Sequence, residues 1–190
     1  MEGTVYVTGA DRGLGFALTE VFLETGYKVY AGSYLNDWPE LSRLQEEYPD
    51  LLRRVPLDVT SEDSVEKAAQ VIQAESDELD ILINNTGTAE DRSGTIFDKQ
   101  YFDDIRRLYE INALGPLRVT QSVLPLLLAG RMKRLVNISS LAGSVGTITR
   151  VTQYGYTMSK AALNMQTKLL HNHLRDKGVR VLAIHPGGMR

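Results

Sequence analysis

Short apolar runs alternate with longer amphipathic runs along the chain, and this alternation restricts its possible folds more than any other feature. Runs rich in Val, Ile, Leu and Tyr are typical of strands buried on both faces, and the segments between them have helical spacing. We expect strands at Thr4–Thr8, Tyr27–Ala31, Arg54–Leu57, Asp80–Asn84, Arg134–Ile138 and Val179–Ile184. We expect helices at Leu14–Thr25, Trp38–Tyr48, Phe102–Leu128 and Tyr156–Leu174, and another from the N-cap Ser61 to Ala74. The pattern predicts an α/β fold with one doubly wound parallel sheet.

The composition fits one domain over residues 1–190 and argues against several classes of function. The chain has 190 residues, the size of one α/β domain. It contains no cysteine, which excludes disulfides, thiolate catalysis and cysteine-based metal sites. The net charge of −3 gives no basic field for nucleic acid or an anionic membrane. Because neither a leader peptide nor an apolar run long enough to cross a membrane is seen, we expect a cytoplasmic protein.

A glycine-rich turn joins the first expected strand to the first expected helix, in the order Thr8-Gly9-Ala10-Asp11-Arg12-Gly13-Leu14-Gly15. In such a turn Gly9 permits the sharp change of direction, Gly13 lets a pyrophosphate approach the backbone, and Gly15 allows close packing of the helix. The N–H groups at the start of a helix bind phosphates. An ordinary turn is the alternative, but the position in the first strand–helix unit favours a dinucleotide site.

The same turn has the spacing T-G-x-x-x-G-x-G, and five further segments accompany it along the chain. They are Asn84-Asn85-Thr86-Gly87, Ile111-Asn112-Ala113-Leu114-Gly115-Pro116, Asn137-Ile138-Ser139-Ser140, Tyr156-Thr157-Met158-Ser159-Lys160 and His185-Pro186-Gly187. With these segments the chain resembles the short-chain dehydrogenase/reductase family, and within it the small carbonyl reductases that include C-factor-like and sniffer-like proteins. The resemblance implies a Rossmann fold. It also implies hydride transfer between a nicotinamide cofactor and a carbonyl or alcohol of a small organic substrate.

The resemblance assigns four catalytic residues. Tyr156 and Lys160 are four positions apart on a helix, so their side chains share one face, and an ammonium beside a phenol favours the phenolate. Tyr156 would be the general acid/base, and Lys160 would also hold the nicotinamide ribose. Ser140 would polarise the substrate carbonyl, and Asn112 would hold a water in a proton relay with Lys160. Ser139 and Tyr154 are the alternatives to Ser140 and Tyr156, although Tyr154 lacks a lysine four residues later.

The second expected strand is followed by Ser33 and Tyr34, with no carboxylate before Asp37. A carboxylate at this position favours NAD, whereas Arg12 in the glycine turn favours a 2′-phosphate. We therefore expect NADP(H) rather than NAD(H), unless Asp37 folds back. The cofactor-binding residues expected are Gly9, Arg12, Gly13, Leu14, Gly15, Ser33, Asp58, Val59, Asn85, Gly87, Tyr156, Lys160, Pro186 and Gly187. This chemistry needs no metal, and we expect His171, His173 and His185 to be surface or structural residues.

The sequence departs from the pattern of the family in three places. Thr86 replaces an alanine, and the segment Gly143–Gln153 is a few residues longer than in most relatives. That segment would border the substrate pocket, where its polar residues are candidate substrate contacts or simply a solvated loop; they are Thr147, Thr149, Arg150 and Thr152. The sequence ends soon after its sixth expected strand, without the substrate loop and last strand of relatives, which would leave that strand as an exposed edge.

This third departure supports an alternative function, a dinucleotide-binding regulatory or scaffold protein with little turnover. The expected partner is otherwise a small carbonyl or alcohol substrate. We also expect a homodimer or homotetramer formed through two long helices, or burial of the same side chains in the core of one chain. These side chains are Leu117, Leu124, Leu127 and Leu128 on one helix and Met165, Leu169 and Leu170 on the other.

Overall fold

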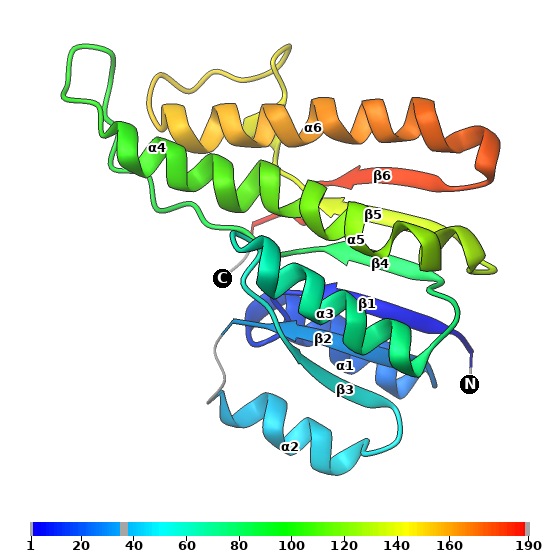
Figure 1. Ribbon diagram of the computed structural model, residues 1–190. Coiled ribbons are helices and arrows are strands. Elements are labelled where there is room, and N and C mark those ends of the chain that lie inside the picture. Colours follow the sequence, from blue (N-terminus) through cyan, green and yellow to red (C-terminus); the bar gives the residue numbers. More distant parts are fainter. Residues whose placement is uncertain (1, 35–37, 189–190) are drawn as a thin grey trace.

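The strands lie side by side in one parallel sheet in a computed structural model, which describes residues 2–34 and 38–188 (Figure 1). They are β1 (Thr4–Thr8), β2 (Lys28–Ser33), β3 (Leu52–Pro56), β4 (Ile81–Asn84), β5 (Arg134–Ile138) and β6 (Arg180–Ile184). Their order in the sheet is β3-β2-β1-β4-β5-β6. The sheet grows outward in both directions from β1 and β4, which confirms the expected doubly wound, Rossmann-like topology.

Helices cover both faces of the sheet. They are α1 (Gly13–Glu24), α2 (Pro39–Glu47), α3 (Glu62–Glu75), α4 (Phe102–Tyr109), α5 (Gly115–Ala129) and α6 (Tyr154–Leu174), with the short turns η1 (Glu110–Leu114), η2 (Leu141–Gly143) and η3 (Arg175–Lys177). Apolar side chains of α1 and α2 pack on one face, and those of α3, α5 and α6 pack on the other. Ser61 caps α3 as expected, its hydroxyl accepting a hydrogen bond from Ser64 N at 3.2 Å.

The buried face of α1 differs from the expectation. The sequence contains Phe16, Ala17, Val21 and Leu23 as apolar positions, yet Ala17 and Val21 are exposed. The buried positions are Gly15, Thr19 and Leu23, which recur every fourth residue on one side of the helix. Gly15 sets this face because its missing side chain lets α1 lie directly against the carbonyl of Gly9.

The long amphipathic segment after β4 is not one regular helix. α4 and α5 are joined by η1, a five-residue π-helical turn. Pro116, at the start of α5, has no N–H to donate to the carbonyl of Asn112, so the regular hydrogen-bond ladder is interrupted there. Such π-turns are frequent at functional sites, and this one contains Asn112.

A buried polar network attaches the helices to the middle of the sheet. Asn84 Nδ2 donates to Asn137 Oδ1 at 2.8 Å and to Thr120 Oγ1 at 3.1 Å. Asn137 Nδ2 in turn donates to Thr167 Oγ1 at 2.9 Å. These contacts join β4 to β5, β4 to α5, and β5 to α6. Nothing in the hydrophobic pattern predicts them.

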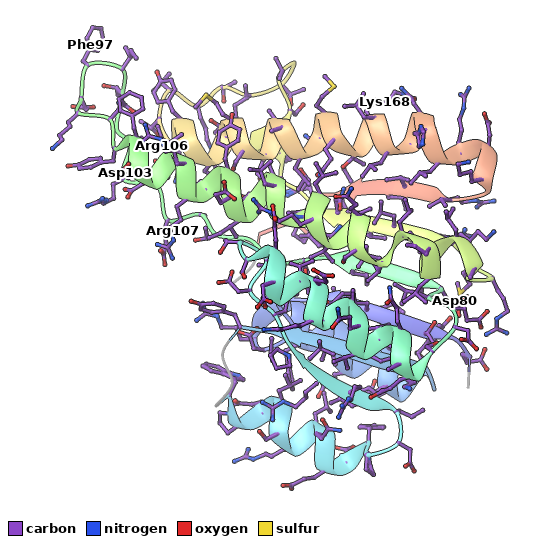
Figure 2. The ribbon with its side chains drawn as sticks, in the orientation of Figure 1. Asp80, Phe97, Asp103, Arg106, Arg107 and Lys168 are labelled. Carbon is purple, nitrogen blue, oxygen red and sulfur yellow. The ribbon has the colours of Figure 1, made fainter. Side chains whose placement is uncertain are left out.

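The two ends of the sheet are held in different ways (Figure 2). At the amino ends of the strands, the buried Asp80 accepts hydrogen bonds from the backbone N–H groups of Thr4, Arg131 and Met132 at 2.8 to 3.0 Å. At the carboxyl ends, the loop between β4 and α4 extends away from the sheet, and the exposed Phe97 lies at its tip. The carboxyl end therefore has the long loops that a binding site needs.

β6 forms one edge of the sheet, as expected, and Leu182 and Ile184 on it are 49% and 41% exposed. The helix residues named for subunit pairing divide into two groups. Leu117, Met165 and Leu169 are exposed, whereas Leu127 belongs to the core and Leu124, Leu128 and Leu170 pack against it. The homodimer or homotetramer stays a prediction. Within residues 2–34 and 38–188, none of the helices combines the length and apolar character needed to cross a bilayer.

Candidate active site

An open cavity of about 420 Å³ lies at the carboxyl ends of β4, β5 and β6. Its lining comes from five parts of the chain: the segment after β4 with Asn85 and Gly87, the end of β5 with Ser139 and Ser140, Arg150 in the loop before α6, the first turns of α6, and residues 185–188 after β6. Parallel sheets bind ligands at this edge, next to the point where the strand order reverses. Four expected site segments that are far apart in the sequence meet here.

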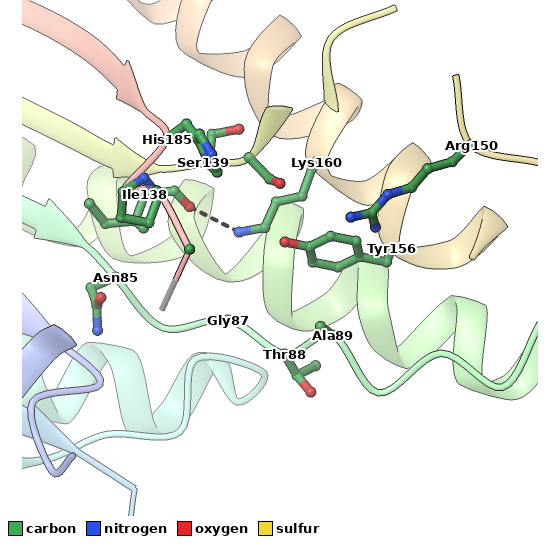
Figure 3. Close-up of a pocket in the computed structure, with 14 residues that line it drawn as sticks. Asn85, Gly87, Thr88, Ala89, Ile138, Ser139, Arg150, Tyr156, Lys160 and His185 are labelled. Atoms are coloured by element: carbon green, nitrogen blue, oxygen red, sulfur yellow. Dashed lines mark hydrogen bonds between the residues drawn. The ribbon is translucent and has the colours of Figure 1, made fainter. Parts of the chain in front are cut away.

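Tyr156 and Lys160 both face the cavity from α6, and Figure 3 shows the hydroxyl of Tyr156 directed toward the amine of Lys160. Lys160 is only 5% exposed, and its Nζ donates to the carbonyl oxygen of Ile138 at 2.9 Å. Burial lowers the pKa of Lys160 to about 8. Tyr154 does not line the cavity. A phenol beside a buried amine can exchange a proton with an oxygen atom of a bound molecule.

The two serines at the end of β5 have different hydrogen bonds. The hydroxyl of Ser139 donates to Asn164 Oδ1 at 2.6 Å. The hydroxyl of Ser140 accepts from Ala142 N at 3.1 Å, which leaves its own proton available to a ligand. This difference favours Ser140 over Ser139 as the donor to a substrate oxygen.

Asn112 is buried in η1 and does not line the cavity. Its Oδ1 accepts from Thr88 N, and its Nδ2 donates to the carbonyl oxygen of Thr88, each at 2.9 Å. Nδ2 also donates to Ser159 Oγ at 3.0 Å. The side chain therefore fixes the segment after β4 against α6, and a part in a water relay with Lys160 stays a prediction.

The glycine turn has the geometry that a phosphate cradle requires. Gly9 and Gly13 have φ of 65° and 57°, a region that side chains disfavour. None of the described residues lies within 4 Å of the place where a Cβ of Gly13 would stand, so its backbone is open to a ligand. Arg12, at the N-cap of α1, makes no side-chain cap, and the first N–H groups of α1 remain available. Asn85 connects the turn to the cavity, since its Nδ2 donates to the carbonyl oxygens of Thr8 and Gly9 at 3.0 Å.

The other expected cofactor residues are distributed along the same edge. Ser33 is buried at the end of β2, next to the exposed Tyr34, and Asp37 lies outside the described residues. Pro186 and Gly187 line the cavity. The carboxylate of Asp58 accepts from the backbone and hydroxyl of Thr60, at 2.9 and 2.7 Å. Val59 is buried in the core, so only its backbone can reach a ligand, whereas Leu14 packs against the core and stays partly exposed.

Asp91 is a structural part of the site that the sequence did not indicate. Gln153, at the N-cap of α6, makes no side-chain cap. Asp91, in the loop after β4, replaces it: its Oδ2 accepts from Tyr156 N and its Oδ1 from Ser93 N, each at 2.8 Å. Partial burial by itself raises the pKa of Asp91, but hydrogen bonds from Ser93 and from the start of α6 lower the pKa below its ordinary value. No local motif predicts a cap from 65 positions away.

The ionisable side chains on the cavity wall are basic ones. Lys160 and Arg150 line it, together with His185, whereas no aspartate or glutamate is among the described residues that do. His185 thus borders the site, whereas His173 is exposed on α6. Of the long loop's candidate contacts, Arg150 reaches the cavity, but Thr147, Thr149 and Thr152 do not. In the described part of the chain, no three His, Asp or Glu side chains are grouped as metal ligands.

Comparisons with known proteins agree with this geometry. The family model described as "short chain dehydrogenase" matches residues 3–190. C-signal of Myxococcus xanthus is 42% identical over 112 residues, which cover 57% of this chain and 64% of the relative.

Two solved carbonyl reductases have the same fold over nearly the full chain. The NADPH-bound carbonyl reductase from chicken fatty liver has a TM-score of 0.86 at 32% identity, and the match covers 97% of this chain and 79% of the other. Carbonyl reductase Sniffer of D. melanogaster has a TM-score of 0.89 at 25% identity, and the match covers 98% and 81%. The sequence motifs, the sheet topology and the cavity residues thus have one common explanation, which is that this chain belongs to the short-chain dehydrogenase family of oxidoreductases.

Proposed function

We propose that the protein is an NADP(H)-preferring oxidoreductase that interconverts a carbonyl and an alcohol of a small organic substrate, with Tyr156 as general acid/base. One observation carries the proposal: the hydroxyl of Tyr156 and the amine of Lys160 lie together in a cavity that also contains Ser140. These three side chains supply a proton, a positive charge and a hydrogen-bond donor to one reacting oxygen.

The residues fit a dinucleotide. Gly13 offers open backbone, and the start of α1 offers uncapped N–H groups for the phosphates. Asn85 and Gly87 continue the same edge from the glycine turn into the cavity. When bound, the nicotinamide supplies or accepts the hydride.

The protein's own residues would handle the oxygen and its proton. In reduction, the hydroxyl of Tyr156 donates its proton to the substrate carbonyl oxygen, and in oxidation it takes a proton from the alcohol. The ammonium form of Lys160 stabilises the phenolate that remains after reduction. Ser140 donates a hydrogen bond to the same oxygen and polarises the carbonyl. Asn112 and Asp91 position the segment after β4 and the start of α6 around these groups.

The preference for NADP(H) rests on charges near the adenosine end. Arg12 is exposed at the start of α1, and Ser33 at the end of β2 is followed by Tyr34 rather than by a carboxylate. The carbonyl reductase from chicken fatty liver, a structural relative, was solved with NADPH bound. If the preference is correct, a fluorescence titration gives a lower Kd for NADPH than for NADH. The reverse order would point to a contact from Asp37.

The decisive test compares Tyr156→Phe with Tyr154→Phe, a second tyrosine of the same helix turn that lies outside the cavity. Reduction of a panel of aldehydes and ketones by NADPH is measured, together with the Kd of NADPH. We expect Tyr156→Phe to lose about 10²- to 10⁴-fold in kcat, the range of general acid catalysis, and to keep its Kd. Tyr154→Phe should retain activity. Cofactor binding by wild type without turnover, unaffected by Tyr156→Phe, would instead support a dinucleotide-binding regulatory or scaffold protein.

A further inference from the structure

Arg150 lines the cavity, but none of the proposed chemistry uses it. Figure 3 shows its guanidinium directed inward, near Tyr156 and on the far side of that residue from Asn85. Asn85 is hydrogen-bonded to the glycine turn, where the phosphates of a dinucleotide would bind. The guanidinium is therefore placed at the end of the cavity that is left for the substrate.

The position of Arg150 is held by the start of α6. Its Nη1 donates to Gln153 Oε1 at 2.6 Å, and Gln153 is the N-cap of α6. The backbone N–H of Gln153 donates in turn to the carbonyl oxygen of Ser93 at 3.2 Å. Tyr156 follows Gln153 by about one helical turn. The first turn of α6 therefore positions both the guanidinium of Arg150 and the hydroxyl of Tyr156.

The remaining donors of Arg150 are available to a ligand. A guanidinium has five N–H donors in a planar fork, which fits the two oxygens of a carboxylate. Among the residues that the structure describes, no aspartate or glutamate forms an ion pair with Arg150. The cavity wall contains Lys160 as a second cation and no described carboxylate. An anionic group is attracted to such a wall, and a cationic one is repelled.

We propose that Arg150 is a specificity-determining residue that binds a carboxylate of the substrate, so that the enzyme acts on oxo acids or hydroxy acids in preference to neutral carbonyl compounds. The proposal rests on the proposed function, because the carboxylate must belong to a molecule whose carbonyl reaches Tyr156. A carboxylate held by Arg150 would orient that carbonyl toward the hydroxyl and contribute binding energy outside the reacting atoms.

The test uses matched substrates, each an oxo acid and its methyl ester, with the full chain and NADPH. Wild type should have a higher kcat/KM for the acid. Arg150→Gln should lose about 10- to 100-fold for the acid, mainly through KM, and leave the ester unchanged. Arg150→Lys should recover part of the loss, because it restores the charge without the planar fork. The control is Arg43→Gln, an exposed arginine on α2 that does not line the cavity. Equal activity of Arg150→Gln and wild type on the acid would overturn the proposal.

A binding measurement separates this proposal from the proposed function. Calorimetry follows a saturated carboxylic acid, which cannot be reduced, as it binds to the complex of protein and NADPH. Binding to wild type that is weakened by Arg150→Gln supports the carboxylate site even if no substrate is turned over. Binding that is equal in both proteins, or absent from wild type, contradicts it. Loss of turnover with retained carboxylate binding would count against the proposed function alone.

Discussion

The two sides of the cavity are built differently. One side consists of strand ends and the helix residue packed on them, where Lys160 is buried and hydrogen-bonded to Ile138, and Asn85 is tied to the glycine turn. The other side is the loop 144–153, in which Val145 and Val151 are 82% and 68% exposed. Arg150 reaches the cavity from this second side.

This difference matches the two roles proposed above: the strand side holds the groups proposed to react, and the loop side holds the group proposed to select the substrate. Groups that transfer a proton must be held within fractions of an ångström, and a parallel sheet with a packed helix holds them in this way. A loop with few buried contacts tolerates changes of sequence and length without loss of the fold. We therefore expect substitutions on the strand side to reduce stability and activity together, and those on the loop side to change substrate preference alone.

The largest expected loss of stability is at Gly15 on α1, which packs against Gly9 and Asn85 next to the strand side of the cavity. A Cβ there would collide with the carbonyl oxygen of Gly9 and approach Asn85 Nδ2. Because the collision is with backbone, Gly15→Ala must displace α1, and we expect a loss of about 3 kcal/mol or more in the free energy of unfolding, with loss of cofactor binding. Urea unfolding measures it. Gly146→Ala is the control on the loop side, because a Cβ there meets no atom of the residues that the structure describes within 4 Å. Similar losses in both variants would refute the contrast between the two sides.

A smaller effect is expected at Asn84, in the polar network beneath the cavity. Asn84→Leu keeps the branched shape and the number of side-chain heavy atoms but removes the donor to Asn137 Oδ1 and Thr120 Oγ1. Leaving these buried groups unpaired should cost about 1–3 kcal/mol in the free energy of unfolding. The matched loop variant is Thr147→Val, which removes an exposed hydroxyl that donates to Ser144 Oγ, and should change stability by less than about 0.5 kcal/mol. Thermal unfolding of both variants measures these losses. A larger loss of stability in Thr147→Val than in Asn84→Leu would contradict the comparison.

Asp91 connects the two sides, and its expected effect is the smallest. Asp91→Asn keeps the shape but loses the negative charge at the start of α6, with an expected loss of about 1 kcal/mol at pH 7. The folded state lowers the pKa of Asp91, so its contribution is complete at pH values above the unfolded pKa of about 3.9 and disappears as the pH falls through the folded pKa.

Urea unfolding of wild type and Asp91→Asn at pH 7 and at successively lower pH measures this dependence. The difference between the two proteins should shrink only in the acid range. A difference that is constant over that range would show that the charge of Asp91 does not support α6.

Several features of the site followed from local sequence. The glycine turn, the strand before it and the Tyr156–Lys160 pair depend on neighbours within a few residues, and the structure places each of them as the residues indicate. The division of the segment 102–128 did not follow. The sequence contains Pro116, which interrupts a regular helix. Whether the chain forms a π-turn there or simply ends the helix depends on how Asn112 fits between Thr88 and Ser159.

The sequence by itself determined the order of strands and helices and the parallel sheet, because periodicity and turn chemistry act over short distances along the chain. The candidate catalytic residues followed from the resemblance of its motifs to those of a known family. Only the tertiary structure decided which side chains meet. It placed Asp91 at the start of α6, paired the hydroxyl of Ser139 with Asn164 in a hydrogen bond, and turned Arg150 toward the cavity. Such contacts join residues from separate segments, and their partners are set by packing, which no local pattern encodes.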